Sequence, residues 1–160
     1  AALTGHLVFS TVHTNDAAGA ITRLLDMGVE NYLISSALLG VLAQRLVRVI
    51  CKTCVEPTKV SPALMVEMGS HDQGDIKTFH GKGCKGCSHT GFRGRAGIYE
   101  LLVVDDAIRQ LILTKSTAQI IRETARKKGM TTLREDGWKK VAEGITTVEE
   151  VLRVTLSEHT

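Results

Sequence analysis

The sequence of 160 residues has few aromatic residues, only two prolines and no apolar run long enough to span a bilayer. Aromatic residues make up 4% of the chain, which leaves few platforms on which nucleotide bases can stack. Because proline is scarce and no low-complexity segment is present, we expect no long disordered linker. The net charge of +3 is too small to indicate nucleic-acid binding by itself. These properties are those of an ordinary globular chain.

Three well-known active-site motifs are also missing. The sequence contains no G-x-x-x-x-G-K-[ST] phosphate loop, no H-E-x-x-H zinc-protease helix and no G-x-S-x-G nucleophile turn. Composition and spacing alone therefore indicate no particular reaction. They do indicate a metal site, because the cysteines follow a metal-binding pattern.

The four cysteines form two C-x-x-C pairs, Cys51 with Cys54 and Cys84 with Cys87. Two thiolates three positions apart on a tight turn can hold one tetrahedral metal ion, and a second such turn completes a four-thiolate shell. The second pair lies in a glycine-rich stretch, residues 81–87, where glycines let the backbone fold closely around an ion. The spacing therefore predicts one structural zinc ion bound by all four cysteines.

Other uses of these cysteines are possible on the sequence alone. Two disulfides would suit a secreted chain, but no apolar signal segment is visible, and a chain of this length can bury a core unaided. A redox site would need only one pair. His80 and His89 lie near the second pair and are alternative ligands, although four thiolates already fill a tetrahedral shell.

The beginning of the chain predicts half of a βαβ unit. Residues 7–12 are rich in β-formers and apolar on both faces, which is typical of a strand inside a parallel sheet. Asn15 is a candidate cap for a helix that ends near Gly28. No other early strand is visible, so we expect the chain to be the C-terminal part of a larger α/β protein.

Further elements are predicted from the spacing of apolar residues and from residues that typically begin or end helices. The apolar positions predict a second helix over residues 30–50. A short helix is predicted over residues 61–68. Residues 91–97 are expected to turn, and residues 98–104 to form a strand.

Helices make up the rest of the chain. The candidate caps are Asp105 or Asp106, Ser116 with Gln119, Thr132 with Glu135, and Thr147 with Glu150. Gly137 is a weak point inside the third of these helices. A small core is predicted from five apolar residues: Trp138, Val141, Val148, Val151 and Leu152.

His13 is the most prominent candidate for chemistry. It lies at the C-terminal end of the first predicted strand and just before a helix, the edge of an α/β sheet where phosphate ligands bind. Thr11 is on the same face of that strand and supplies a hydroxyl, so we expect His13 and Thr11 to contact such a ligand. His6 points to the opposite face. For all three the alternative is a purely structural role in the strand and turn.

Four stretches, in order and over nearly the whole chain, resemble the type II secretion and type IV pilus assembly ATPases, the general secretory pathway protein E family. The run from Leu3 to Ala17 resembles the histidine box of that family. The other matching stretches are Ala43–Arg48 leading into Cys51, Cys84 leading into Gly94–Leu101, and Gly144–Val151.

The resemblance implies a cytoplasmic, hexameric, RecA-like ATPase at the inner membrane, which drives pilus or pseudopilus assembly with membrane platform proteins. His6 and His13 would be catalytic histidines near the nucleotide phosphates, with ATP and Mg²⁺ as cofactors. Residues 1–50 would end the RecA-like core, residues 51–97 would form the zinc module, and residues 98–160 a helical subdomain. The family's phosphate loop and acidic motifs are absent from this sequence, so we expect no ATP hydrolysis by this chain alone.

A different class of function remains open at this point. The chain could be a zinc-ribbon-like nucleic-acid-binding module that uses Lys82, Lys85, Arg93 and Arg95. The low aromatic content argues against this alternative, and we expect no nucleic-acid partner.

Overall fold

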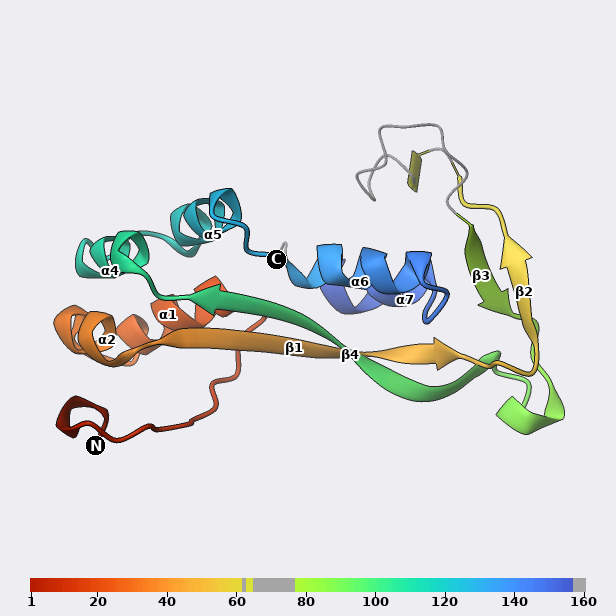
Figure 1. The fold of residues 1–160 in the computed structure, drawn as a ribbon, viewed down its shortest axis with the longest axis horizontal. Helices are drawn as coiled ribbons and strands as arrows, with labels where there is room; N and C mark the ends of the chain where they lie inside the picture. Colours follow the sequence, from red (N-terminus) through yellow and green to blue (C-terminus); the bar gives the residue numbers. More distant parts are fainter. Residues whose placement is uncertain (62, 65–76, 157–160) are drawn as a thin grey trace. The chain divides into compact units, whose positions relative to one another are not determined.

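The computed structural model describes residues 1–61, 63–64 and 77–156 and combines helices with strands (Figure 1). The α/β character predicted from the sequence is confirmed at this level. The strands are β1 (Gly40–Ile50), β2 (Val55–Thr58), β3 (Thr78–Gly81) and β4 (Phe92–Val103). The α-helices are α1 (Ala17–Asp26), α2 (Asn31–Ala37), α4 (Asp106–Leu113), α5 (Ala118–Lys127), α6 (Leu133–Ala142) and α7 (Val148–Thr155). Within the described ranges, no helix has the length and apolar character needed to cross a membrane.

Two compact units divide the chain, and each combines two separate segments. Unit 1 consists of Ala1–Gln44 and Tyr99–Thr132, and unit 2 of Arg45–Ile98 and Leu133–Thr160. The strands form two two-stranded sheets, β1 with β4 and β2 with β3. The unit boundaries fall within β1 and near the end of β4. The three consecutive parts expected from the sequence stay a prediction about the family's domains.

Unit 1 is built around an apolar cluster contributed by α1, α2, α4, α5 and the end of β4. Apolar residues three and four positions apart give each helix one buried face, as Ile108 and Ile112 do in α4 and Ile121 and Ala125 in α5. In β4 the side chains alternate, so that Leu102 is buried between two exposed neighbours. The buried members of the cluster are Ala17, Ala18, Ile21, Ile34, Leu102, Val104, Ile108, Ile112, Ile121 and Ala125.

Helix caps in unit 1 differ from two of the sequence predictions. The N-cap of α1 is Asp16 and not Asn15, because the Asp16 carboxylate accepts a hydrogen bond from the Gly19 amide. The N-cap of α5 is Thr117 and not Ser116, since the Thr117 hydroxyl accepts from the Ile120 amide. Asp105 caps α4 as predicted. Each correction is a shift of one residue among neighbours that can all serve as caps.

Unit 2 has the small helical core that the sequence predicts. Trp138, Val141, Val148 and Val151 are buried together, with Leu152 packed against them. Gly137 is a contact point and not only a weak point, because a Cβ there would lie 2.5 Å from a methyl of Val151. The absence of a side chain therefore lets α6 and α7 approach closely. Thr147 caps α7 as predicted.

The predicted strand over residues 7–12 is wrong for this structure. These residues have no regular secondary structure, and their apolar side chains are exposed, Phe9 by 88%. A buried strand needs neighbouring strands to accept and donate its backbone hydrogen bonds. No described strand pairs with this segment.

The predicted helix over residues 30–50 is wrong beyond its first turns. Helix α2 ends at Ala37, and Gly40–Ile50 form the long strand β1. The apolar residues of this stretch satisfy a helical period and an alternating period at once. The alternating period prevails in β1, where exposure switches at nearly every residue, consistent with a run rich in valine and leucine.

The predicted strand over residues 98–104 is confirmed, but β4 begins earlier, at Phe92. The expected turn at 91–97 is therefore mostly extended chain, although Gly91 and Gly94 do have positive φ. The short helix expected over residues 61–68 lies for the most part outside the described residues.

Candidate metal centre

The four cysteine sulfurs of unit 2 converge on one point. All four Sγ atoms lie within 4.8 Å of one another. The Sγ distances are 3.9 Å for Cys51 to Cys84, 3.9 Å for Cys54 to Cys87, and 3.7 Å for Cys84 to Cys87. Disulfide sulfurs are about 2.05 Å apart, so all four cysteines are free thiols. The disulfide alternative is not what this structure contains.

Each cysteine pair is carried on a tight backbone turn. The Cys54 amide donates to the Cys51 carbonyl, and the Cys87 amide donates to the Cys84 carbonyl. The second turn continues through Ser88 and His89, both with positive φ. The two turns are joined by hydrogen bonds from Lys82 N to Cys54 O and from Cys51 N to Gly91 O, each 2.9 Å.

Two glycines let the backbone segments beside the site touch. A Cβ on Gly81 would lie 2.0 Å from the Gly91 carbonyl oxygen, and a Cβ on Gly91 would lie 2.3 Å from the Gly81 carbonyl oxygen. No other residue can therefore occupy either position without moving backbone. This contact holds the end of β3 against the residue that precedes β4, and so closes the loop that carries Cys84 and Cys87.

Backbone amides point at the sulfurs, as expected for thiolates. Gly83 N donates to Cys54 Sγ at 3.3 Å, Cys84 N to Cys87 Sγ at 3.2 Å and Gly91 N to Cys87 Sγ at 3.3 Å. The Cys84 amide, followed by the Gly91 amide, lowers the pKa of Cys87 to about 6.

The other two perturbed thiols move in opposite directions. Hydrogen bonding from the Thr53 backbone lowers the pKa of Cys51. Burial raises the pKa of Cys54 to about 12. A cation that binds all four sulfurs must therefore displace at least the Cys54 proton, so its affinity rises with pH.

A zinc ion fits this donor set. Thiolates about 2.3 Å from zinc in a tetrahedron are about 3.8 Å apart, and the three measured sulfur pairs lie close to that value. Four soft thiolates with no oxygen donor favour zinc over magnesium or calcium. His80 and His89 are exposed, and among the described residues the group with metal-binding geometry contains cysteines only.

The strand that enters the metal site is bonded to the turn between α6 and α7. Ile50, the neighbour of Cys51, donates its amide to the Ile145 carbonyl at 2.9 Å. Thr146 Oγ1 donates to the Arg48 carbonyl at 2.8 Å. The turn thus runs along the last residues of β1.

Glu150 completes this attachment. Its side chain is 2% exposed and accepts hydrogen bonds from Arg48 N at 3.0 Å, Arg48 Nη2 at 2.6 Å and Arg153 Nε at 2.9 Å. The Arg48 guanidinium also stacks over Phe92, 4.1 Å from the ring centre. Burial by itself raises the pKa of Glu150, but the bonds from Arg153 and Arg48 outweigh it and lower the pKa to about 2.

The histidine segment belongs to unit 1, whereas the cysteines belong to unit 2. His6, Thr11 and His13 are all exposed, on a segment before α1 that has no regular secondary structure. His6 Nδ1 lies 3.2 Å from the Thr4 hydroxyl. Catalytic roles for His6 and His13, and ligand contacts by His13 and Thr11, stay predictions.

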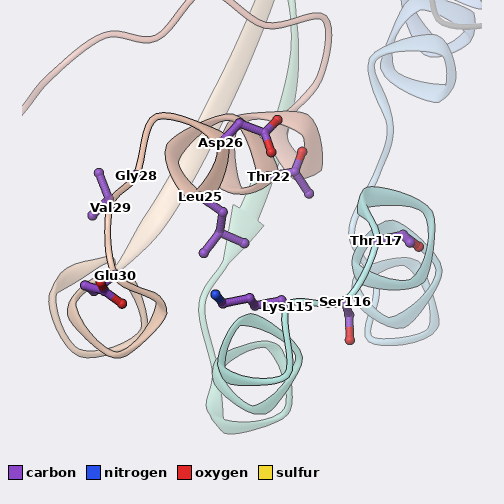
Figure 2. A pocket seen from close by; sticks show the side chains of 9 residues that line it. All are labelled: Thr22, Leu25, Asp26, Gly28, Val29, Glu30, Lys115, Ser116 and Thr117. Carbon is purple, nitrogen blue, oxygen red and sulfur yellow. The ribbon is translucent and has the colours of Figure 1, made fainter.

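A pocket of about 340 Å³ lies in unit 1, between the turn from α1 to α2 and the turn from α4 to α5. Figure 2 shows Leu25 pointing into it from α1 and the Lys115 ammonium extending toward α2. Its polar lining mixes the carboxylates of Asp26 and Glu30 with hydroxyls. It contains none of the site residues predicted from the sequence.

Three polar side chains of unit 1 were not predicted as site residues. Asp16 forms an ion pair with Arg122 of α5, and Glu100 of β4 accepts a hydrogen bond from the Ala17 amide at 2.9 Å. The one available signal was Glu100, a carboxylate in register with the buried residues of an otherwise apolar strand. Glu100 is 83 residues from Ala17, and Arg122 is 106 residues from Asp16, so neither pairing can be predicted from local spacing.

The family model of the type II/IV secretion system protein matches residues 1–153. The chain therefore belongs to this family, as the four resembling stretches indicated.

Curated relatives agree with that assignment. The chain is 53% identical over 158 residues to the type II secretion system protein E of Pseudomonas aeruginosa, covering 99% of this chain and 31% of that protein. It is 54% identical over 159 residues to the type IV pilus assembly ATPase PilB of Thermus thermophilus, covering 98% of this chain and 18% of that protein. The type II secretion system ATPase E of Vibrio cholerae is 50% identical over 155 residues, with 97% and 31% covered. The chain thus spans less than a third of each of these relatives.

One solved structure has a similar fold. The crystal structure of the pilus retraction motor PilT with bound ADP matches with a TM-score of 0.57 and 24% identity, covering 94% of this chain and 33% of that chain. At this identity the likeness shows the fold alone.

Proposed function

We propose that this chain is the C-terminal part of a cytoplasmic, hexameric ATPase that powers type II secretion or type IV pilus assembly. The family match over residues 1–153 carries the proposal. The relatives named type II secretion protein E and type IV pilus ATPase support both systems equally, since their identities to this chain are 53% and 54%. In this proposal the intact protein works with inner-membrane platform proteins and binds no nucleic acid.

Residues 1–50 would then end a RecA-like nucleotide-binding core that binds ATP and Mg²⁺ through motifs outside this sequence. His13 is the residue of this chain proposed to act in the reaction, with Thr11 and His6 near it. The imidazole of His13 donates a hydrogen bond to the terminal phosphate or to a water beside it. His13 is exposed and lies three residues before Asp16, the N-cap of α1, which supports that role.

Residues 51–97 would form a structural zinc module, with Cys51, Cys54, Cys84 and Cys87 as its ligands. The converging sulfurs and the amides directed at them support zinc. When bound, the ion supplies a cross-link between the two turns and no chemistry. Residues 98–160 would form the helical subdomain.

The test of the proposed activity uses the full-length protein and this chain side by side. We expect ATP hydrolysis by the full-length protein and none by this chain, because charge stabilisation in phosphoryl transfer comes from the phosphate loop and its Mg²⁺. His13→Ala in the full-length protein should lower kcat by about 10- to 1000-fold, with a smaller change in nucleotide affinity. Wild-type turnover in that variant would refute the role of His13. ATP hydrolysis by the purified short chain would refute the statement that hydrolysis depends on motifs outside this sequence.

A further inference from the structure

Two buried carboxylates from different parts of unit 1 hold the first turn of α1. Asp16, the N-cap, has a side chain that is 7% exposed, and Glu100 on β4 is 2% exposed. Asp16 Oδ1 accepts from Gly19 N at 2.6 Å, and Glu100 Oε1 accepts from Ala17 N at 2.9 Å. Two of the amides that a helix N-terminus leaves without helical partners are therefore bound by side chains.

Arg122 supplies a positive charge at this point. Its guanidinium donates from Nη2 to Asp16 Oδ2, while Oδ1 of the same carboxylate caps the helix. Arg122 is carried by α5, and its side chain is 30% exposed. The bond thus connects the start of α1 to a helix more than a hundred residues later in the chain.

The ion pair fixes the direction of the Asp16 carboxylate. A nearly buried carboxylate without its cationic partner is costly, so on loss of Arg122 it would turn toward solvent and release the Gly19 amide. Gly19 leaves room for this cap, because a Cβ there would lie 2.9 Å from Asp16 Oδ1. Glu100 alone would then hold the helix start.

His13 lies three residues before Asp16, and the chain between them is short. Thr14 Oγ1 donates to the Asp16 carbonyl at 3.1 Å and ties this link to the helix start. Residues 6–13 are exposed and have no regular secondary structure. Of the points at which this segment meets the rest of unit 1, the attachment at Asp16 is therefore the one nearest to His13.

We propose that Arg122 is a positioning residue for His13, acting through Asp16 and the first turn of α1. The inference rests on the role of His13 under the proposed function. Arg122 touches neither nucleotide nor His13 in this account; it keeps the helix start, and hence the imidazole, in the orientation that the reaction needs. Small displacements of a reacting group are enough to cost about 100-fold in rate.

The experiment is a steady-state ATPase measurement on the full-length protein with Arg122→Gln, Arg122→Lys and the matched control Lys127→Gln. Lys127 is exposed at the end of the same helix, and Lys127→Gln removes one positive charge, as Arg122→Gln does. We expect Arg122→Gln to lower kcat by about 10- to 100-fold with KM for ATP nearly unchanged. Arg122→Lys should recover part of that loss, and Lys127→Gln should match wild type. Equal rates in Arg122→Gln and Lys127→Gln would overturn the inference.

A double-mutant cycle separates this inference from the proposed function. If Arg122 acts through His13, adding Arg122→Gln to His13→Ala should lower kcat no further. Full multiplication of the two losses would show that Arg122 acts elsewhere, and would leave the role of His13 intact. Wild-type turnover in His13→Ala itself would instead remove the proposed role on which the inference rests. If Arg122→Gln does not fold, Arg122→Lys enters the same cycle with a smaller expected loss, judged by the same two outcomes.

Discussion

The two units of this chain are stabilised by different means. Unit 1 has a cluster of ten buried residues, all of them apolar, spread over four helices and a strand. The corresponding cluster in unit 2 has four buried residues, all on α6 and α7. Unit 2 also buries Val47, Ile50, Ile98 and Leu133 outside that cluster. Within the described ranges it further contains the cysteine turns, short backbone contacts and the buried carboxylate Glu150.

The difference shows where each unit should be vulnerable. The free energy of unfolding of unit 1 should fall when apolar contacts are lost and should hardly change when metal is removed. The free energy of unfolding of unit 2 should fall on metal removal and on loss of polar bonds, because its small apolar cluster cannot offset these losses. The α6–α7 pair belongs with the metal site in this respect, since Ile145, Thr146 and Glu150 all bind the strand that leads to Cys51.

Metal removal should have the largest effect and the most uneven one. We expect about one zinc per chain, and chelation should abolish amide protection in β2, β3, α6 and α7 while α1, α4 and α5 keep theirs. Hydrogen exchange followed by mass spectrometry measures this directly. The single tryptophan, Trp138, lies in the unit 2 cluster and gives a fluorescence signal for the same event. Equal loss of protection in both units, or no zinc in protein purified without chelator, would contradict the comparison.

Truncation of the unit 1 core should have the next largest effect. Ile112→Ala removes a fully buried side chain and should lower the free energy of unfolding of unit 1 by about 3 kcal/mol. Leu113→Ala, at a position in the same helix that is 38% exposed, is the control and should cost less than Ile112→Ala, about 1 kcal/mol. Zinc content and Trp138 fluorescence should not change in either variant. A loss of zinc in Ile112→Ala would mean that the two units do not respond separately.

Loss of Glu150 should destabilise unit 2 by a smaller amount. Glu150→Gln should lower its free energy of unfolding by about 2 kcal/mol at pH 7, because bonds from Arg48 and Arg153 lose a charged acceptor. Glu149→Gln removes the same charge from an exposed neighbour and should be nearly neutral.

The pH dependence of this difference follows from the lowered pKa. A carboxylate with pKa about 2 in the folded state contributes its stability above its ordinary pKa of 4.5, and loses it as the pH falls from there toward 2. The difference in free energy of unfolding between wild type and Glu150→Gln, measured by denaturant titration, should therefore be constant above about pH 5 and should shrink as the pH falls below that value. A gap that widened on acidification would have the wrong sign for this explanation.

The smallest expected effect concerns one helix cap in unit 1. Thr117→Ala should cost about 1 kcal/mol, because the Ile120 amide loses its acceptor. Ser116→Ala should cost close to nothing, since the hydroxyl of Ser116 forms its hydrogen bond with the exposed hydroxyl of Thr114 and caps no helix amide in this account. Thermal unfolding of the two variants compares them, and a reversed order would restore the cap predicted from the sequence.

Local features were the ones that the sequence could predict. Each C-x-x-C pair places two sulfurs on one turn, so the grouping of the four cysteines followed from spacing. The caps Asp105 and Thr147 and the Trp138 cluster also followed from residues within one or two helical turns of each other. The same reasoning failed over residues 40–50, where valines and leucines satisfy two periods and only the pairing with β4 decides.

Contacts between residues far apart in the chain could not be predicted from the sequence. Whether residues 7–12 form a strand depends on neighbouring strands that the segment itself does not specify. The pairing of Asp16 with Arg122, and of Glu100 with Ala17, depends on how distant segments pack in the finished fold. The sequence therefore predicted the clustering of the four cysteines and did not predict the surroundings of the histidine segment.

The contact between Gly81 and Gly91 has a consequence for how this protein can vary. Most tight contacts in proteins tolerate an enlarged side chain if the opposite side chain becomes smaller. Here both partners are already the smallest residue, and the atoms that would clash are backbone carbonyls. If one glycine is replaced, no substitution of the other can make room for the new side chain, so only a return to glycine restores the contact.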